Sequence, residues 1–150
     1  MPEKDRKTLF LGEILIQKGW LTWEKLEEAL SIQKETGRIL GDILVDRGYI
    51  SKENLFRALA VQYNKTYVDF STITIPEDVP KKIPKALALK HKCIPLVLKG
   101  NVLLIAISNP MNVWAESEIR KYAEGYEVHI VLATPEDIEK AISEHYGLDA

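Results

Sequence analysis

Two stretches of the chain read almost alike: FLGEILIQKGWLTWEKLEEALSIQ at residues 10–33 and ILGDILVDRGYISKENLFRALAVQ at residues 39–62. They share ten identical residues in 24 aligned positions, whereas average composition would give roughly one or two by chance. The identical pairs are Leu11/Leu40, Gly12/Gly41, Ile14/Ile43, Leu15/Leu44, Gly19/Gly48, Glu24/Glu53, Leu26/Leu55, Ala29/Ala58, Leu30/Leu59 and Gln33/Gln62. The two stretches are therefore copies of one structural unit.

Each copy predicts a short helix, a turn and a longer helix. In the first copy we expect the short helix near Leu11–Lys18, ending at Gly19, which can adopt the left-handed backbone that closes many helices. Thr22 then begins the longer helix, because its hydroxyl can accept a hydrogen bond from a backbone N–H that the first turn leaves unpaired. Gly48 and Ser51 repeat both signals in the second copy.

The longer helices carry leucine and glutamine at matching places. Residues spaced i, i+4 and i+7 share one face of a helix. The two faces with this spacing are Leu26–Leu30–Gln33 and Leu55–Leu59–Gln62. Leucine at this spacing is usually ordinary core, and glutamine can simply end an apolar stripe. An amide repeated on an apolar face also needs hydrogen-bond partners, so a polar ligand is the other interpretation.

Each copy has a glycine as its third residue, Gly12 in the first copy and Gly41 in the second. We expect each to stand at the start of its short helix. A missing side chain there would let a ligand approach backbone N–H groups closely.

The repeat resembles the tandem motif of the MshEN domain, found at the N-terminus of ATPases that drive type II secretion and type IV pilus assembly. Each copy of that motif reads Arg-Leu-Gly-x-x-Leu-x-x-x-Gly, then six variable residues, then Leu-x-x-x-Leu-x-x-Gln, with five residues between the copies. Here the spacer is Lys34–Arg38, and the resemblance extends over nearly the whole chain. A double match of this length is far more specific than a lone glycine motif.

The resemblance implies that the chain binds cyclic di-GMP, a bacterial second messenger, across two half-sites. Leucine faces would contact guanine and ribose, while glycine-flanked N–H groups and glutamine amides would bind the polar edges. With Arg38 added as a neighbouring cation, the implied ligand-binding residues are Leu11, Gly12, Leu26, Leu30, Gln33, Arg38, Leu40, Gly41, Leu55, Leu59 and Gln62.

The first position of both copies departs from the family motif. Phe10 and Ile39 replace arginine, which would supply planar stacking and charge-assisted bonds. Arg38 lies next to the second of these positions, and Arg6 and Lys7 precede the first, so these cations are candidates to compensate. The alternative function is therefore a protein–protein adaptor that has lost its ligand and docks a secretion ATPase to its membrane platform.

The second half predicts strands and helices in alternation. A strand is expected at Tyr67–Phe70, and the proline- and threonine-rich segment Ser71–Pro84 indicates an irregular connector at a subdomain boundary. The further expected elements are a helix at Pro84–Lys92, strands near Cys93–Leu98 and Val102–Ile107, a helix at Asn112–Glu124, a strand at Glu127–Leu132 and a helix after Thr134. The predicted class is α+β, with an all-helical tandem repeat at residues 1–66 and a small α/β sandwich at residues 67–150.

Composition narrows the function further. The net charge of −2 gives no positive field for a nucleic-acid polymer, and no apolar run is long enough to span a bilayer. The single cysteine, Cys93, suits a reducing compartment. We therefore expect a cytoplasmic protein. The family resemblance implies that its partners are a secretion or pilus ATPase domain or an inner-membrane platform protein, through which it would reach the inner membrane. A basic cluster at residues 81–92 is interpreted as a solvated helix surface, with an acidic partner or lipid headgroups as the alternative.

Catalytic motifs are missing from the sequence. His91, His129 and His145 lack metal-type spacing, so we expect neither a metal nor a catalytic role for them. No Gly-x-x-x-x-Gly-Lys-Ser/Thr phosphate loop occurs, so ATP hydrolysis of the parent family's kind is not expected in this chain. The chain is then either a regulatory domain excised from a longer motor or a free-standing relative acting through partners.

Overall fold

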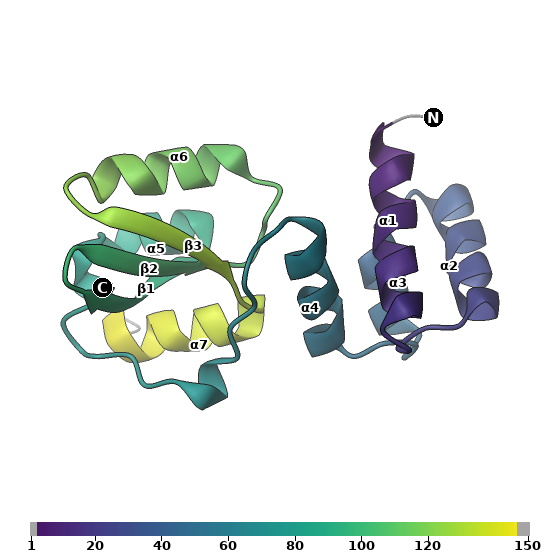
Figure 1. Ribbon diagram of the computed structural model, residues 1–150, viewed down its shortest axis with the longest axis horizontal. Coiled ribbons are helices and arrows are strands. Elements are labelled where there is room, and N and C mark those ends of the chain that lie inside the picture. The colour runs from purple at the N-terminus through teal and green to yellow at the C-terminus, as the bar shows by residue number, and fades with distance from the viewer. Residues whose placement is uncertain (1–2, 147–150) are drawn as a thin grey trace. The chain divides into compact units, whose positions relative to one another are not determined.

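A computed structural model describes residues 3–146 of the chain, with side chains from residue 10 to residue 146. The described residues form seven α-helices, two short 3-10 helices and one three-stranded sheet, so the α+β class is confirmed. The chain divides into two compact units, Met1–Asn64 and Lys65–Ala150 (Figure 1).

The first unit is all helical. Its helices are α1 (Glu3–Gln17), α2 (Trp23–Thr36), α3 (Leu40–Asp46) and α4 (Lys52–Gln62). The expected start of the first helix at Leu11 was wrong, because α1 already begins at Glu3. The residues between these two positions are mostly polar, but none is proline or glycine, so nothing there stops the helix.

Both copies use the same helix ends. Gly19 and Gly48 have φ values of 78° and 73°, the left-handed region in which glycine is unstrained. Thr22 and Ser51 each accept a hydrogen bond from the backbone N–H three residues later, which confirms both as the caps of the longer helices.

The helices of the two copies pack crosswise. Helix α1 contacts α4, and α2 contacts α3. Exchanging the copies turns the first interface into the second, so the unit has an approximate two-fold relation. Six repeat-equivalent pairs are buried together: Leu11/Leu40, Ile14/Ile43, Leu15/Leu44, Leu21/Ile50, Leu26/Leu55 and Ala29/Ala58.

The second unit contains the sheet. Its strands are β1 (Cys93–Lys99), β2 (Val102–Ile107) and β3 (Glu127–Leu132), and its helices are α5 (Lys85–His91), α6 (Val113–Tyr122) and α7 (Pro135–Tyr146). The sheet order is β1-β2-β3, with β1 antiparallel and β3 parallel to β2. These elements confirm the helices and strands predicted from Pro84 onward.

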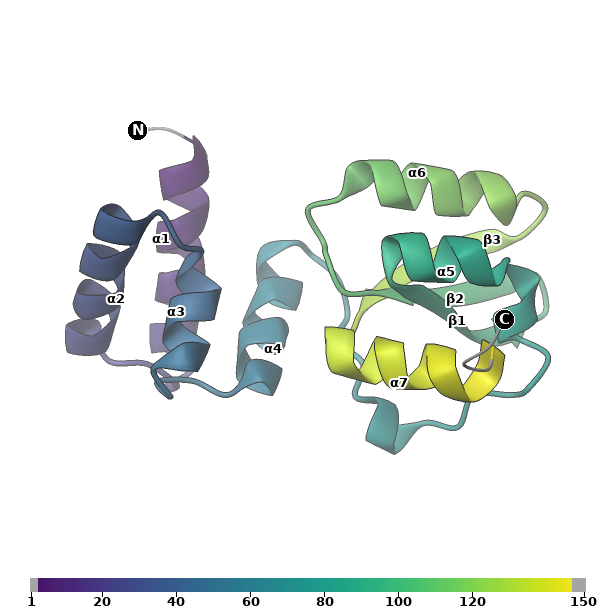
Figure 2. The same ribbon diagram turned by 180° about the vertical axis from the view of Figure 1, so that it is seen from behind.

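Helices cover both faces of this sheet. Ile105, Ala106 and Ile107 are consecutive and all buried, although successive strand residues point to opposite faces. Figures 1 and 2 show α6 on one side of the strands and α7 on the other. Among the described helices, none is long and apolar enough to cross a membrane.

The strand expected at Tyr67–Phe70 was wrong. Tyr67 makes a single isolated bridge to Leu132. The carboxylate of Asp69 then accepts a hydrogen bond from the N–H of Ser71 at 2.9 Å, and this side-chain contact starts the 3-10 helix η1 (Phe70–Thr72). Asparagine and aspartate side chains compete with sheet pairing in this way.

The irregular connector belongs to the second unit. It contains the 3-10 helix η2 (Pro80–Lys82), which contacts β1 and α7. The hydroxyl of Tyr146 at the end of α7 donates to the carbonyl oxygens of Pro80 and Ile83, the latter at 3.1 Å. The segment therefore packs on the α/β unit instead of separating the two units.

Three side chains of the basic cluster lie beside carboxylates of the second unit. Lys90 Nζ and His91 Nε2 lie 3.4 and 3.2 Å from the Glu118 carboxylate, and Lys92 Nζ lies 2.7 Å from Glu139. The contact with His91, and after it the contact with Lys90, lowers the pKa of Glu118. Part of the cluster thus has acidic partners inside its own fold.

Candidate ligand-binding surface

Four side chains at repeat-equivalent positions are partly exposed. They are Leu30 and Gln33 on α2, and Leu59 and Gln62 on α4. Each pair is spaced three residues apart, so each lies on one face of its helix. The two copies therefore present the same apolar-plus-amide pair to solvent. Beyond this pair of residues the two helices differ in length. Helix α2 runs three residues past Gln33, whereas α4 ends at Gln62.

The other motif leucines lie in the core. Leu11, Leu26, Leu40 and Leu55 are all buried within the first unit. Their side chains hold the four helices together in this structure. Ligand contact by these four leucines stays a prediction, while Leu30 and Leu59 are the motif leucines with open surface.

The glycines are positioned for packing. Gly12 was expected at the start of a helix, and this was wrong because it lies well inside α1. A Cβ added to Gly12 would lie 2.8 Å from Cδ1 of Leu26, and one added to Gly41 would lie 3.0 Å from Cδ1 of Leu55. Both glycines thus allow α1 and α3 to approach the leucine of the following helix closely.

The first residue of each copy is exposed. Phe10 is 48% and Ile39 62% exposed, although the leucine that follows each of them is buried. Arg38 is also exposed, and its guanidinium pairs with Asp46. Arg38 therefore already has an acidic partner beside the second copy. The side chains of Arg6 and Lys7 lie outside the described ones.

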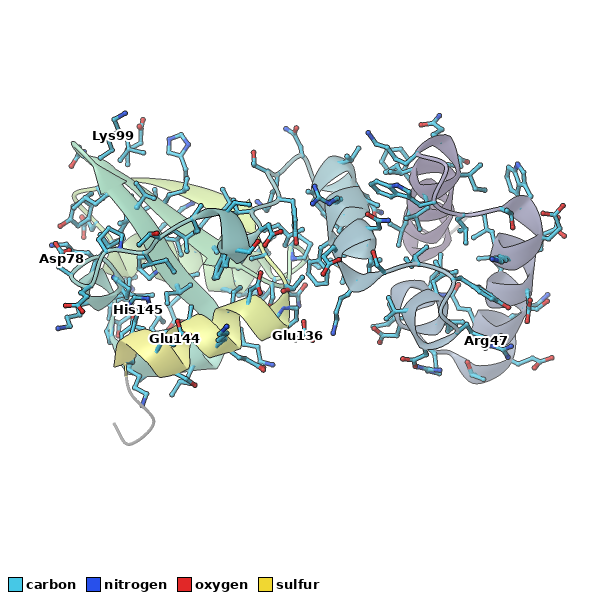
Figure 3. The ribbon with its side chains drawn as sticks, turned by 90° about the horizontal axis from the view of Figure 1, so that it is seen from below. Arg47, Asp78, Lys99, Glu136, Glu144 and His145 are labelled. Atoms are coloured by element: carbon cyan, nitrogen blue, oxygen red, sulfur yellow. The ribbon has the colours of Figure 1, made fainter. Side chains whose placement is uncertain are left out.

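Polar contacts also join the two copies. Arg47 Nη1 lies 3.0 Å from Glu28, and the Tyr49 hydroxyl donates to the same carboxylate at 2.6 Å. The hydrogen bond to Glu28 is the main cause that raises the pKa of Tyr49. Lys25 Nζ lies 5.3 Å from the centre of the Tyr49 ring. Arg47 is labelled in Figure 3. These contacts fix the second copy against α2.

Sequence reasoning omitted Trp23 from this surface. Its side chain is 56% exposed at the first residue of α2. Trp23 precedes Leu26 by three residues and Leu30 by seven, so it borders the same face. That spacing could have identified it, but the second copy has Lys52 at this position, so Trp23 is not one of the residues that the two copies share.

Two surface hollows occur in the second unit. One, of about 420 Å³, lies between the connector and α7 and includes Ile73, Glu144 and His145. Figure 3 labels the last two on α7. The other, of about 560 Å³, is a shallow groove along α6 beside Trp114 and Tyr122. In residues 3–146 no group of three or more His, Cys, Asp or Glu side chains is arranged to hold a metal ion.

The structure therefore defines a two-part α+β protein, with a helical tandem repeat followed by a small α/β unit. The family model of the MshEN domain matches residues 63–150, which is more than half of the chain. The chain therefore belongs to the MshEN domain family. The matched range covers the second unit and the last two residues of the first, so it does not include the repeat.

Two curated relatives are type IV pilus assembly ATPases. PilB of Myxococcus xanthus is 29% identical over 137 residues, which make up 91% of this chain and 24% of that protein. PilB of Acinetobacter baylyi is 25% identical over 132 residues, which make up 88% of this chain and 23% of that protein. The chain thus spans about a quarter of the length of these relatives.

Matches to solved structures cover more than 90% of this chain and so extend into the repeat region. The structure of MshE with cdg has a TM-score of 0.77 and 29% identity, and the match covers 91% of this chain and 98% of that one. The N-terminal domain of XpsE matches with a TM-score of 0.65 at 18% identity over 94% and 96% of the two chains. At that identity the XpsE likeness shows the fold alone.

Proposed function

We propose that this chain is a regulatory module that binds cyclic di-GMP across its two repeat copies. The observation that carries the proposal is the matched exposure of Leu30 with Gln33 and of Leu59 with Gln62. A ligand with two chemically equal halves fits a protein surface with two equal halves. The crosswise packing of α1 on α4 and α2 on α3 supplies the two-fold relation that such a ligand needs.

Each half-site combines apolar and polar recognition. The exposed parts of Leu30 and Leu59 offer apolar contact for a base or ribose. The amides of Gln33 and Gln62 carry both donors and acceptors, which suit the edge of guanine. The motif residues assigned to the ligand, five in each copy, would act together, with the buried leucines and glycines among them holding the surface in shape.

The comparisons support this ligand. MshE, which is 29% identical to this chain over nearly the whole of its matched structure, was solved with cdg, which we take as cyclic di-GMP. The PilB relatives are pilus assembly ATPases about four times as long as the matched segment. We therefore place the module in the cytoplasm, in a secretion or pilus assembly ATPase system, where ligand binding biases docking on the ATPase domain or on an inner-membrane platform protein.

Titration calorimetry with cyclic di-GMP tests the proposal. The whole chain should bind, and Gln33→Ala or Gln62→Ala should each weaken binding by roughly two- to tenfold, the effect of one lost hydrogen bond. Urea unfolding should show little change in stability for either variant. Gln17→Ala is the matched control, because Gln17 is an exposed glutamine that lies outside the motif, at the end of α1.

The opposite pattern would contradict a ligand role for the amides. Strong destabilisation with unchanged affinity would make the two glutamines structural. The absence of heat and of NMR shift changes at high micromolar cyclic di-GMP would reject the ligand itself.

A second candidate function is the adaptor, and the exposure of apolar Phe10 and Ile39 in place of arginine favours it. In that case the wild-type chain binds no dinucleotide, and Phe10→Arg with Ile39→Arg creates binding. A pull-down without nucleotide should then recover an inner-membrane platform protein of the secretion system. Failure to recover one would count against the adaptor.

A further inference from the structure

The outer face of α6 presents large apolar side chains to solvent. Trp114 is 82% exposed, Val113 67% and Tyr122 57%. The groove of about 560 Å³ along α6 runs past Trp114 and Tyr122. In Figures 1 and 2 no described element of the second unit lies over the outer side of this helix. Exposed apolar surface gathered along one helix is typical of an interaction site.

The charged side chains of α6 differ in whether they have partners. Both carboxylates of the helix already lie beside cations of the second unit, Glu116 at 2.7 Å from Lys65 and Glu118 at 3.4 Å from Lys90. Lys121 also lines the groove. Its side chain makes no hydrogen bond or ion pair with any residue that the structure describes. The face therefore combines an unpaired cation with exposed aromatic rings.

We infer that this face of α6 pairs with the same face of a second copy of the chain, with the two helices antiparallel. Trp114 and Lys121 are seven residues apart, so both lie on one side of the helix. In a two-fold pair both copies use the same patch, so that residue i contacts j and j contacts i. The antiparallel arrangement places each Trp114 opposite the other copy's Lys121, and an ammonium group over an indole face is a favourable cation–π contact.

The other residues of the face fit the same register. When residue 114 opposes residue 121, Val113 opposes Tyr122, which gives an apolar contact at each end of the pair. Ser117 lies near the centre and opposes Glu118, whose carboxylate can accept a hydrogen bond from the serine hydroxyl. A small side chain at the crossing point also lets two helices approach closely.

A second copy suits this face better than an anionic membrane does. From Lys65 to Ala150 the sequence has ten Lys and Arg and twelve Asp and Glu, so the second unit has no positive field for lipid headgroups. In the antiparallel pair, by contrast, the cation and the ring that complement each other both come from α6. This helix has only 10 residues, whereas a standard interface uses about 20–30 residues a side. The dimer should therefore be weak, with a Kd on the order of 100 µM.

Sedimentation equilibrium of the whole chain tests the pairing. Between about 10 µM and about 1 mM the average mass should rise from 17.1 kDa toward twice that value. Trp114→Lys should abolish the rise, because two pairs of lysines would oppose each other. Lys121→Glu should weaken the dimer at least about fivefold, the scale of two exposed cation–π contacts. The double variant should recover the wild-type Kd to within about fivefold, because each new lysine would then face a glutamate.

A matched control and a local readout accompany these variants. Lys140→Glu makes the same charge change as Lys121→Glu at an exposed lysine of α7, on the other side of the sheet, and should leave the Kd unchanged. In NMR spectra of the wild type, the amides of Val113–Tyr122 should shift with protein concentration while those of α7 do not. Circular dichroism checks that every variant is folded.

Three results would overturn the inference. The first is a chain that stays monomeric at about 1 mM. The second is a dimer that Trp114→Lys leaves intact, or that the double variant fails to restore. The third is a monomeric chain that co-sediments with phosphatidylglycerol vesicles and loses that binding in Trp114→Lys, which would assign the face to a membrane. The inference goes beyond the proposed function and does not depend on it, so none of these results bears on the dinucleotide.

Discussion

Gly12 and Gly41 illustrate how one residue type can support two opposite interpretations. In sequence, a repeated glycine beside an expected helix start favours exposed N–H groups that bind a ligand. In the structure each glycine faces a buried leucine of the next helix, where an added methyl group would clash at Gly12 and fit tightly at Gly41. The repeated glycine is therefore explained by close helix packing in each copy, independently of any ligand.

Replacing Gly12 with alanine should lower the free energy of unfolding by about 1 kcal/mol. Overpacking a filled core costs about 1–3 kcal/mol, and the higher helix propensity of alanine offsets about 1 kcal/mol of that cost. Gly41→Ala should be nearly neutral, because its added Cβ would meet Leu55 at 3.0 Å instead of 2.8 Å. Urea unfolding monitored by circular dichroism measures both.

A background mutation provides the control for this prediction. In a Leu26→Ala chain the clash disappears, so Gly12→Ala should become stabilising. If Gly12→Ala has the same effect in both backgrounds, the two residues are not in contact and the packing explanation is wrong.

The sequence predicts which residues of the site are equivalent, but it does not predict how far each side chain is exposed. The alignment of the copies shows which residues are equivalent, and the ten identical pairs are indeed matched in burial. It does not show that Leu26 is buried while Leu30 is partly open, although both lie on one helical face. That difference depends on which helix covers the face, and the crosswise packing joins residues far apart in the chain.

At the scale of elements, the sequence predicts a helix start correctly where the contact that fixes it lies within a few residues. Cap residues such as Thr22, Ser51 and Thr134 fixed helix starts, because each hydroxyl accepts a hydrogen bond within its own first turn. The strand expected at Tyr67–Phe70 was wrong, and the cause is also a local side-chain hydrogen bond. Asp69 makes a local hydrogen bond that competes with strand pairing, and hydrophobic pattern does not include that contact.

The connector is held to α7 by one side chain. The hydroxyl of Tyr146 donates to carbonyl oxygens at Pro80 and Ile83, and burial raises its pKa above the usual value. Tyr146→Phe should remove this link and leave the ring in place. We expect a loss of about 1–2 kcal/mol in the free energy of unfolding, because the two carbonyl oxygens lose a hydrogen bond while partly buried.

Hydrogen exchange distinguishes this local effect from a general one. In Tyr146→Phe the amides around η2 should exchange faster, while those of β2 keep the protection set by global stability. Uniformly faster exchange across the sheet would show that Tyr146 supports the whole unit and does not specifically hold the connector.

At the scale of the whole molecule, the family match and the proposed ligand surface fall on different units. The family model matches residues 63–150, whereas the proposed ligand surface lies on the repeat at residues 10–62. Family membership therefore rests mainly on the α/β unit, and the ligand rests on the helical one. A relative could keep the second unit and change the first without leaving the family.

Separate expression of residues 1–64 and 65–150 tests this division of roles. The second fragment should fold alone, with cooperative thermal unfolding and well-dispersed NMR signals, because its sheet is covered by helices on both faces. The first should be helical but less stable, since a chain of about 60 residues buries only about 60% of the surface exposed when unfolded. Cyclic di-GMP at a hundred times its dissociation constant should stabilise the first fragment by about 2.7 kcal/mol and raise its Tm, while leaving the second unchanged. Stabilisation of the second fragment instead would move the ligand site from the repeat to the α/β unit.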